Sequence, residues 1–215
     1  MNRNYFLAGG LMVVAVLVAT LILYPHLPER VPSHWDIHGQ VNAYSSKWTM
    51  LVITPAIMAG LMLLFATLPW LSPRHFDVGA FRSTYLYIML VLLSLTAYVQ
   101  ALMLSTGLAR PVDISRALVG GICLMLALLG NVLGKVQRNF YIGIRTPWTI
   151  ANERVWNATH RFGAKTLVVG GLLGFVLTLA GTAFWIAFAI IMAAALIPAV
   201  YSLVYYKRLE RRGEV

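Results

Sequence analysis

The chain has 215 residues, of which 60% are hydrophobic and only 11% are Asp, Glu, Lys or Arg. Soluble globular proteins carry roughly 25% charged residues, so this composition excludes a water-soluble enzyme, a disordered chain and a collagen-like chain. The net charge of +10 comes from basic residues confined to short segments between apolar runs, which suits anionic lipid headgroups better than nucleic acid. We therefore predict an integral membrane protein that binds the lipid bilayer and has no direct nucleic-acid partner.

Long apolar runs recur along the whole chain. A helix needs about 20 mostly apolar residues to cross about 30 Å of hydrocarbon. Four runs each predict one spanning helix, at residues 6–24, 48–71, 83–106 and 117–134. The run 166–206 is too long for one span, and Ala180-Gly181-Thr182 in its middle predicts a turn between two helices. The sequence thus predicts an all-α fold, a bundle of six transmembrane helices.

The basic residues are distributed unequally between the segments that join these helices. If both termini are cytoplasmic, the inner segments hold 13 Lys and Arg and the outer segments hold 4, which is the bias expected of membrane proteins. The predicted topology gives three regions. They are an N-terminal helical hairpin with an outer loop at 25–47 (1–71), the third helix with its flanking loops (72–116), and a C-terminal region with a cytoplasmic loop at 135–165 and a second helical hairpin (117–215).

The outer loop contains His34, Asp36 and His38, which alternate and would share one face of an extended segment. Imidazole and carboxylate groups both bind divalent cations, so these three residues are candidate metal ligands. We favour the alternative, a polar loop at the membrane surface that is ordered by its own hydrogen bonds and holds neither metal nor cofactor. The other candidate contact residues of this loop are Trp35, Gly39 and Lys47.

The cytoplasmic loop has a more distinctive sequence. Arg145 lies in a Gly-Ile-Arg-Thr-Pro turn, where its guanidinium can make paired hydrogen bonds to a phosphate or carboxylate. An arginine held at the membrane surface, or by carbonyls of its own loop, is an equal alternative. Asn152 and Glu153 predict a helix start, and Trp156 and His160 follow one turn apart. The candidate binding residues are Asn139, Gly143, Arg145, Thr146, Pro147, Trp148, Trp156 and His160.

For His160 we favour a structural role over catalysis. A hydrogen bond from its side chain would fix the loop against the helix that follows.

Several of these segments, taken together, resemble the signature of the SdpI family of bacterial membrane proteins, which confer immunity to a secreted peptide toxin. The segments are Asn131, 139–148, Val155-Trp156 and 159–163. The outer loop is similar to the small domain that commonly precedes this signature, although Asn42 stands where an acidic residue is usual. The resemblance implies a multi-pass protein of the bacterial cytoplasmic membrane that neutralises a toxin. For those members of the family that also signal, the resemblance implies that the protein retains a small transcriptional repressor at the inner face of the membrane.

Two other functions compete with this interpretation, a membrane-embedded enzyme and a small-solute transporter. The predicted spans carry no charged side chain, whereas transporters commonly place such groups within the membrane. The outer and cytoplasmic clusters lie on opposite sides of the predicted bilayer, and each alone lacks a set of nucleophile, base and orienting group. We therefore expect no enzymatic activity and no catalytic residue.

Overall fold

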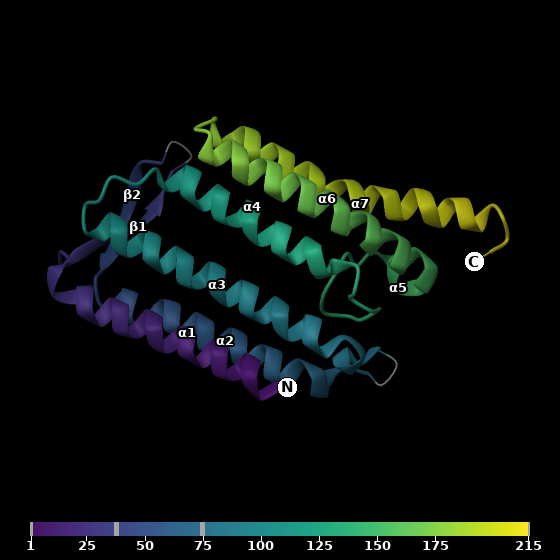
Figure 1. Cartoon of the computed structure of the whole chain (residues 1–215), viewed down its shortest axis with the longest axis horizontal. Coiled ribbons are helices and arrows are strands. Elements are labelled where there is room, and N and C mark those ends of the chain that lie inside the picture. The colour runs from purple at the N-terminus through teal and green to yellow at the C-terminus, as the bar shows by residue number, and fades with distance from the viewer. Residues whose placement is uncertain (1, 37–38, 74–75, 215) are drawn as a thin grey trace.

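A computed structural model of the chain describes residues 2–36, 39–73 and 76–214. Figure 1 shows a long bundle of helices with a small pair of strands at one end. Within the described residues, six helices are long and apolar enough to cross a membrane, which confirms the number that the apolar runs predict. They are α1 (Asn2–Leu23), α2 (Thr49–Leu71), α3 (Arg82–Gly107), α4 (Ile114–Leu133), α6 (Glu153–Leu179) and α7 (Phe184–Glu210). Shorter elements join them: η1 (Tyr24–His26), η3 (Val78–Phe81) and α5 (Pro147–Ala151).

The prediction of an all-α fold is wrong for the outer loop. Strands β1 (Arg30–Trp35) and β2 (Val41–Ser46) form an antiparallel hairpin between α1 and α2. Pro32 cannot continue a helix, and the valine, tyrosine and tryptophan residues around it favour strands. The hairpin packs on the bundle through Val31, which is fully buried. Val31 belongs to a small apolar cluster with Leu27, Met50 and Leu104.

The long apolar run divides where its central turn was predicted. Helix α6 ends at Leu179 and α7 begins at Phe184, with Gly181 between them at φ +80°. Helix α6 begins before the apolar run because Asn152 caps its first turn, accepting hydrogen bonds from the backbone N–H groups of Arg154 and Val155. The fifth span, α6, therefore extends from the cytoplasmic-loop motif directly into the apolar segment.

A buried glutamine connects the first three helices. The amide of Gln100 on α3 donates to Thr20 Oγ1 at 3.0 Å and to the Met50 carbonyl at 2.9 Å, and it accepts from Thr54 Oγ1 at 2.6 Å. Polar groups in a bilayer need such partners because no water is available. Gln100 therefore joins α3 to α1 and α2 by hydrogen bonds that cross between helices.

Helices α4 and α6 approach so closely that their backbones touch. A Cβ atom on Gly171 would lie 2.6 Å from the Cys123 carbonyl oxygen, and one on Gly174 would lie 2.7 Å from the Cys123 sulfur. A Cβ atom on Gly130 would lie 2.9 Å from the backbone nitrogen of Val168. Small residues permit this kind of helix contact in membranes, and here both helices contribute them.

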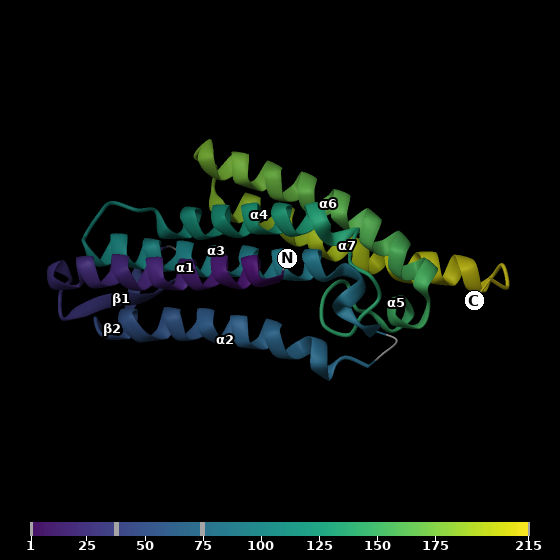
Figure 2. The same ribbon diagram turned by 60° about the horizontal axis from the view of Figure 1, so that its bottom comes forward.

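The two ends of the bundle carry different structures. The hairpin lies at one end, together with the α3–α4 and α6–α7 connections, whereas α5 and the loop before it lie at the other end (Figure 1). The view in Figure 2 gives the same arrangement, and in both views the two ends of the chain point away from the hairpin. The two candidate clusters therefore lie at opposite ends of the helices, as predicted, and do not form one site.

Candidate functional site

The loop that joins α4 to α5 is folded around Asn139. This side chain is fully buried, and its oxygen accepts hydrogen bonds from the backbone N–H groups of Tyr141 and Ile142 at 2.7 and 2.8 Å. Its amide nitrogen donates to the carbonyls of Gln137 and Ile142 at 2.8 and 3.0 Å. An asparagine side chain has two donor hydrogens and two acceptor lone pairs, so the loop uses all four. Asn139 fixes the loop and has no capacity left for a ligand.

His160 attaches this loop to α6. The Ile144 N–H donates to His160 Nε2 at 3.0 Å, and His160 Nδ1 lies 2.8 Å from the Trp156 carbonyl oxygen. A backbone N–H can only donate and a carbonyl can only accept, so we assign the proton to Nδ1 of a neutral imidazole. The predicted bond between loop and helix is confirmed. Because both ring nitrogens are used, His160 has none free to transfer a proton.

Trp156 and Gly143 complete this attachment. The Trp156 ring is fully buried and stacks on His160, with 4.0 Å between ring centroids, and its Nε1 donates to the Val136 carbonyl at 2.8 Å. Gly143 has φ +117°, and a Cβ atom there would overlap His160 Nε2. A glycine is therefore required where the loop passes over the imidazole.

Helix α5 provides a second attachment, this time to α7. Thr146 caps the start of α5 through hydrogen bonds with Thr149. Pro147 lies in the first turn, where a backbone N–H has no partner within the helix, so the missing N–H of proline costs no hydrogen bond. The indole Nε1 of Trp148 donates to Ser202 Oγ on α7. Ser202 is not among the residues predicted from the sequence, because its signal there is a single hydroxyl within the apolar part of α7. We call residues 134–152, held in this way by α6 and α7, the clamped loop.

Arg145 is exposed on the clamped loop and donates to the carbonyl of Phe140. This contact is the bond to a carbonyl of its own loop that the sequence offered as the alternative role of Arg145. A guanidinium has five N–H donors, so a single bond to Phe140 leaves capacity for a phosphate or carboxylate. Pro147 is also exposed, and Thr146 and Trp148 are half-buried. The structure therefore brings the predicted residues together but divides them into buried supports and an exposed face that contains Arg145.

The outer candidate residues lie in and beside the hairpin. His34 Nδ1 on β1 is 2.6 Å from Asn42 Oδ1 on β2, and Asp36 Oδ1 accepts from the Gln40 N–H at 2.9 Å. These bonds match the expected loop ordered by its own hydrogen bonds. Trp35 is half-buried at the end of β1. His38 lies outside the described residues, and within those residues no group of three or more His, Cys, Asp or Glu side chains is placed to hold a metal ion.

Lys47 closes the base of the hairpin. Its Nζ lies 2.8 Å from Glu29 Oε1, and its backbone N–H donates to the Glu29 carbonyl at 3.0 Å. The hydrogen bond to Glu29 raises the pKa of the Lys47 side chain above its ordinary value. Gly39, at φ +77°, turns the chain near α4, where a Cβ atom would lie 3.0 Å from Ser115 Oγ.

Two segments of the chain match known protein families, one that includes the hairpin and one that includes most of the clamped loop. Residues 135–202 match the SdpI/YfhL protein family, and residues 11–59 match a domain of unknown function, DUF1648. The chain is also 31% identical over 201 residues to Immunity protein SdpI of Bacillus subtilis (strain 168), covering 93% of this chain and 94% of that protein. No solved structure matches the chain.

Proposed function

The chain belongs to the SdpI/YfhL protein family, and on this premise we propose that it is an immunity protein of the bacterial cytoplasmic membrane. It protects the cell against a secreted antimicrobial peptide toxin. The observation that carries the proposal is the extent of the similarity to Immunity protein SdpI. A match over 93% of the chain includes both the hairpin and the clamped loop.

The geometry supports a binding function that works at both ends of the bundle. The hairpin is the folded element available to a toxin on the outer side, and the exposed face of the clamped loop is available to a partner inside the cell. This orientation rests on the excess of Lys and Arg at the clamped-loop end. We propose that the inner partner is a small transcriptional repressor, which the protein holds at the membrane when toxin is bound outside.

Arg145 is the residue that we propose for this inner contact. Its side chain is exposed, and the clamped loop beneath it is fixed by Asn139 and His160. A fixed guanidinium makes paired hydrogen bonds to a carboxylate or phosphate, which lysine cannot copy.

The test uses a Bacillus subtilis strain that lacks its own immunity protein and is exposed to the corresponding peptide toxin. Wild-type protein should restore survival, and Arg145→Lys should reduce survival or repressor retention at equal membrane levels. Losing a charge-assisted contact worth about 2 kcal/mol weakens a complex roughly thirtyfold. Arg211→Lys is the matched control because Arg211 is an exposed arginine just beyond α7. Full activity of Arg145→Lys would move the essential contacts elsewhere.

A further inference from the structure

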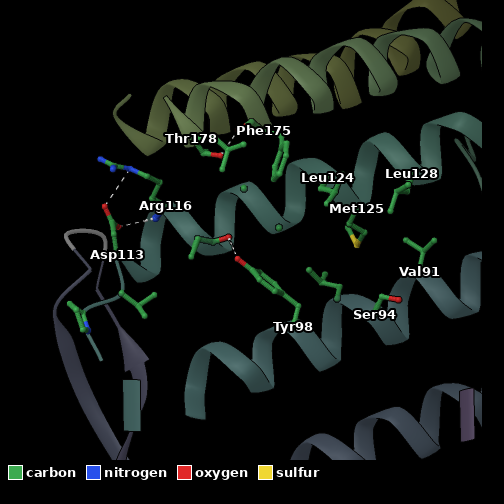
Figure 3. A pocket seen from close by; sticks show the side chains of 17 residues that line it. Val91, Ser94, Tyr98, Asp113, Arg116, Leu124, Met125, Leu128, Phe175 and Thr178 are labelled. Carbon is green, nitrogen blue, oxygen red and sulfur yellow. Dashed lines mark hydrogen bonds and ion pairs between the residues drawn. The ribbon is translucent and has the colours of Figure 1, made fainter. Parts of the chain in front are cut away.

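A cavity of about 650 Å³ lies between α3, α4 and α6, on the side of the bundle nearer the hairpin (Figure 3). Its volume is within the range of about 300–1,000 Å³ that is common for ligand sites. The side chains that line most of it are apolar, among them Val91, Leu95, Leu124, Met125, Leu128 and Phe175. Tyr98, Leu124 and Leu128 are each more than one third exposed, so the cavity opens sideways to the bilayer.

The hydroxyl groups in the wall are already used by the protein. Tyr98 donates to the Ala117 carbonyl at 3.0 Å, Ser94 to Leu90 at 2.8 Å, and Thr178 to Phe175 at 2.7 Å. These bonds leave the wall with apolar surface and no free hydroxyl hydrogen. A polar solute would lose its water there without finding replacement bonds, whereas a hydrocarbon chain has no such cost.

The cavity has the length of one membrane leaflet. On α4 its lining residues run from Arg116 to Leu128, which at 1.5 Å per residue is about 18 Å. Half of a hydrocarbon core of about 30 Å is about 15 Å. Because Ala117 lies in the first turn of α4, the cavity extends from the membrane surface to the middle of the bilayer.

A charged pair marks the surface end of the cavity. Arg116 Nε lies 3.4 Å from Asp113 Oδ2, and Arg116 Nη2 donates to the Gly181 carbonyl at 3.3 Å. Figure 3 shows this pair at the end of the cavity nearest the hairpin. Arg116 Nε is enclosed and, within the part of the chain that the structure describes, has no hydrogen-bond acceptor in good geometry. A cation at headgroup level above an apolar channel is complementary to a lipid phosphate above its acyl chain.

We propose that this cavity binds one phospholipid of the hairpin-side leaflet, with an acyl chain along α4 and its phosphate at Arg116. The lipid would contact both parts of the bundle at once. Its chain would lie between α3, which packs with α1 and α2, and α4, which packs with α6 and α7. The bound lipid therefore completes the packing between α3 and α4.

The test uses full-length protein in nanodiscs of phosphatidylethanolamine and phosphatidylglycerol, released into the gas phase for native mass spectrometry. Met125→Trp fills the cavity from α4. Val169→Trp adds the same side chain at an exposed position of α6 outside the cavity. Arg116→Gln removes the cation at the mouth, and Arg110→Gln is its control, an exposed arginine of the α3–α4 connection. Leu95→Phe fills the cavity from α3 and replaces Met125→Trp if that variant does not fold.

We expect wild type, Val169→Trp and Arg110→Gln to retain one lipid, and Met125→Trp and Leu95→Phe to retain none. Arg116→Gln should bind phosphatidylglycerol roughly fivefold more weakly, because one arginine at an anionic surface contributes about 1 kcal/mol and 1.4 kcal/mol is a decade. Oleate should displace the lipid, and glycerol 3-phosphate alone should not.

Two results would overturn the proposal. One is equal lipid retention by wild type and both cavity-filling variants. The other is a wild-type dimer that Met125→Trp converts to a monomer without loss of lipid, since the cavity would then be filled by a second copy of the chain.

Discussion

The backbone N–H of Ile144 points at Nε2 of His160, 3.0 Å away, and so attaches the clamped loop to a helix that crosses the membrane. The opposite nitrogen of the same ring is bonded to the Trp156 carbonyl within that helix. One neutral imidazole thus sets the distance between the loop and α6. The shape of the exposed face around Arg145 depends on this side chain together with Asn139 and the Trp148–Ser202 bond.

Replacing His160 by Phe should detach the loop without leaving a hole. Phenylalanine retains a ring against Trp156 but accepts no hydrogen bond, so the half-buried Ile144 N–H loses its partner. The expected loss of unfolding free energy is about 1–3 kcal/mol, measured by SDS titration of the purified protein, with faster proteolysis of residues 134–152. His26→Phe, at an exposed histidine of η1, should leave both measurements unchanged. An equally protected loop in His160→Phe would contradict the role assigned here.

Gly143→Ala should be more damaging than an ordinary glycine substitution. Gly213 is the matched control because its φ of +67° is also positive, but a Cβ atom there meets nothing within 4 Å. Gly213→Ala should cost roughly 1–2 kcal/mol at most, the backbone penalty alone. Gly143→Ala should cost more, because its Cβ also overlaps His160. If SDS titration gives the two variants the same stability, the overlap is relieved by movement of the loop.

The sequence predicts most of this fold because its signals are local. Apolar runs give the spans, and the spacing of Trp156 and His160 along one helix is enough to place the bond that holds the loop. The hairpin was missed because its strands depend on the packing of Val31 against Leu104, more than 70 residues away. Ser202 was missed for the same reason, since its partner Trp148 lies on a different element. The bond from Arg145 to Phe140 was one of two interpretations that residue types alone could not separate.

Gln100→Leu should weaken the packing of the first three helices. The substitution removes hydrogen bonds to Thr20, Thr54 and the Met50 carbonyl. Interhelical hydrogen bonds in membranes average about 0.6 kcal/mol each, so the expected loss in unfolding free energy is about 2 kcal/mol. Thr54→Val should show about one third of this loss, and Gln137→Leu, at an exposed glutamine of the clamped loop, should show almost none. A stabilised Gln100→Leu protein would mean that hydrocarbon packing outweighs the network.

The orientation of the bundle is tested by labelling single cysteines in intact cells with a membrane-impermeant maleimide. The native Cys123 is fully buried, so wild type should not react. Ala43→Cys, exposed on β2, should be labelled from outside. Asn157→Cys, exposed on α6, should be labelled only after the membrane is permeabilised. Labelling of both variants in intact cells would rule out the proposed orientation.

The contact between α4 and α6 has a mechanical consequence. Where Gly130 and Gly171 bring two backbones together, neither helix can slide along the other without collision, since no flexible side chains separate them. The pair therefore behaves as one stiff rod that reaches from the level of the hairpin to the clamped loop. A tilt at the hairpin end of α4 would then displace the other end of α6, the helix that carries His160.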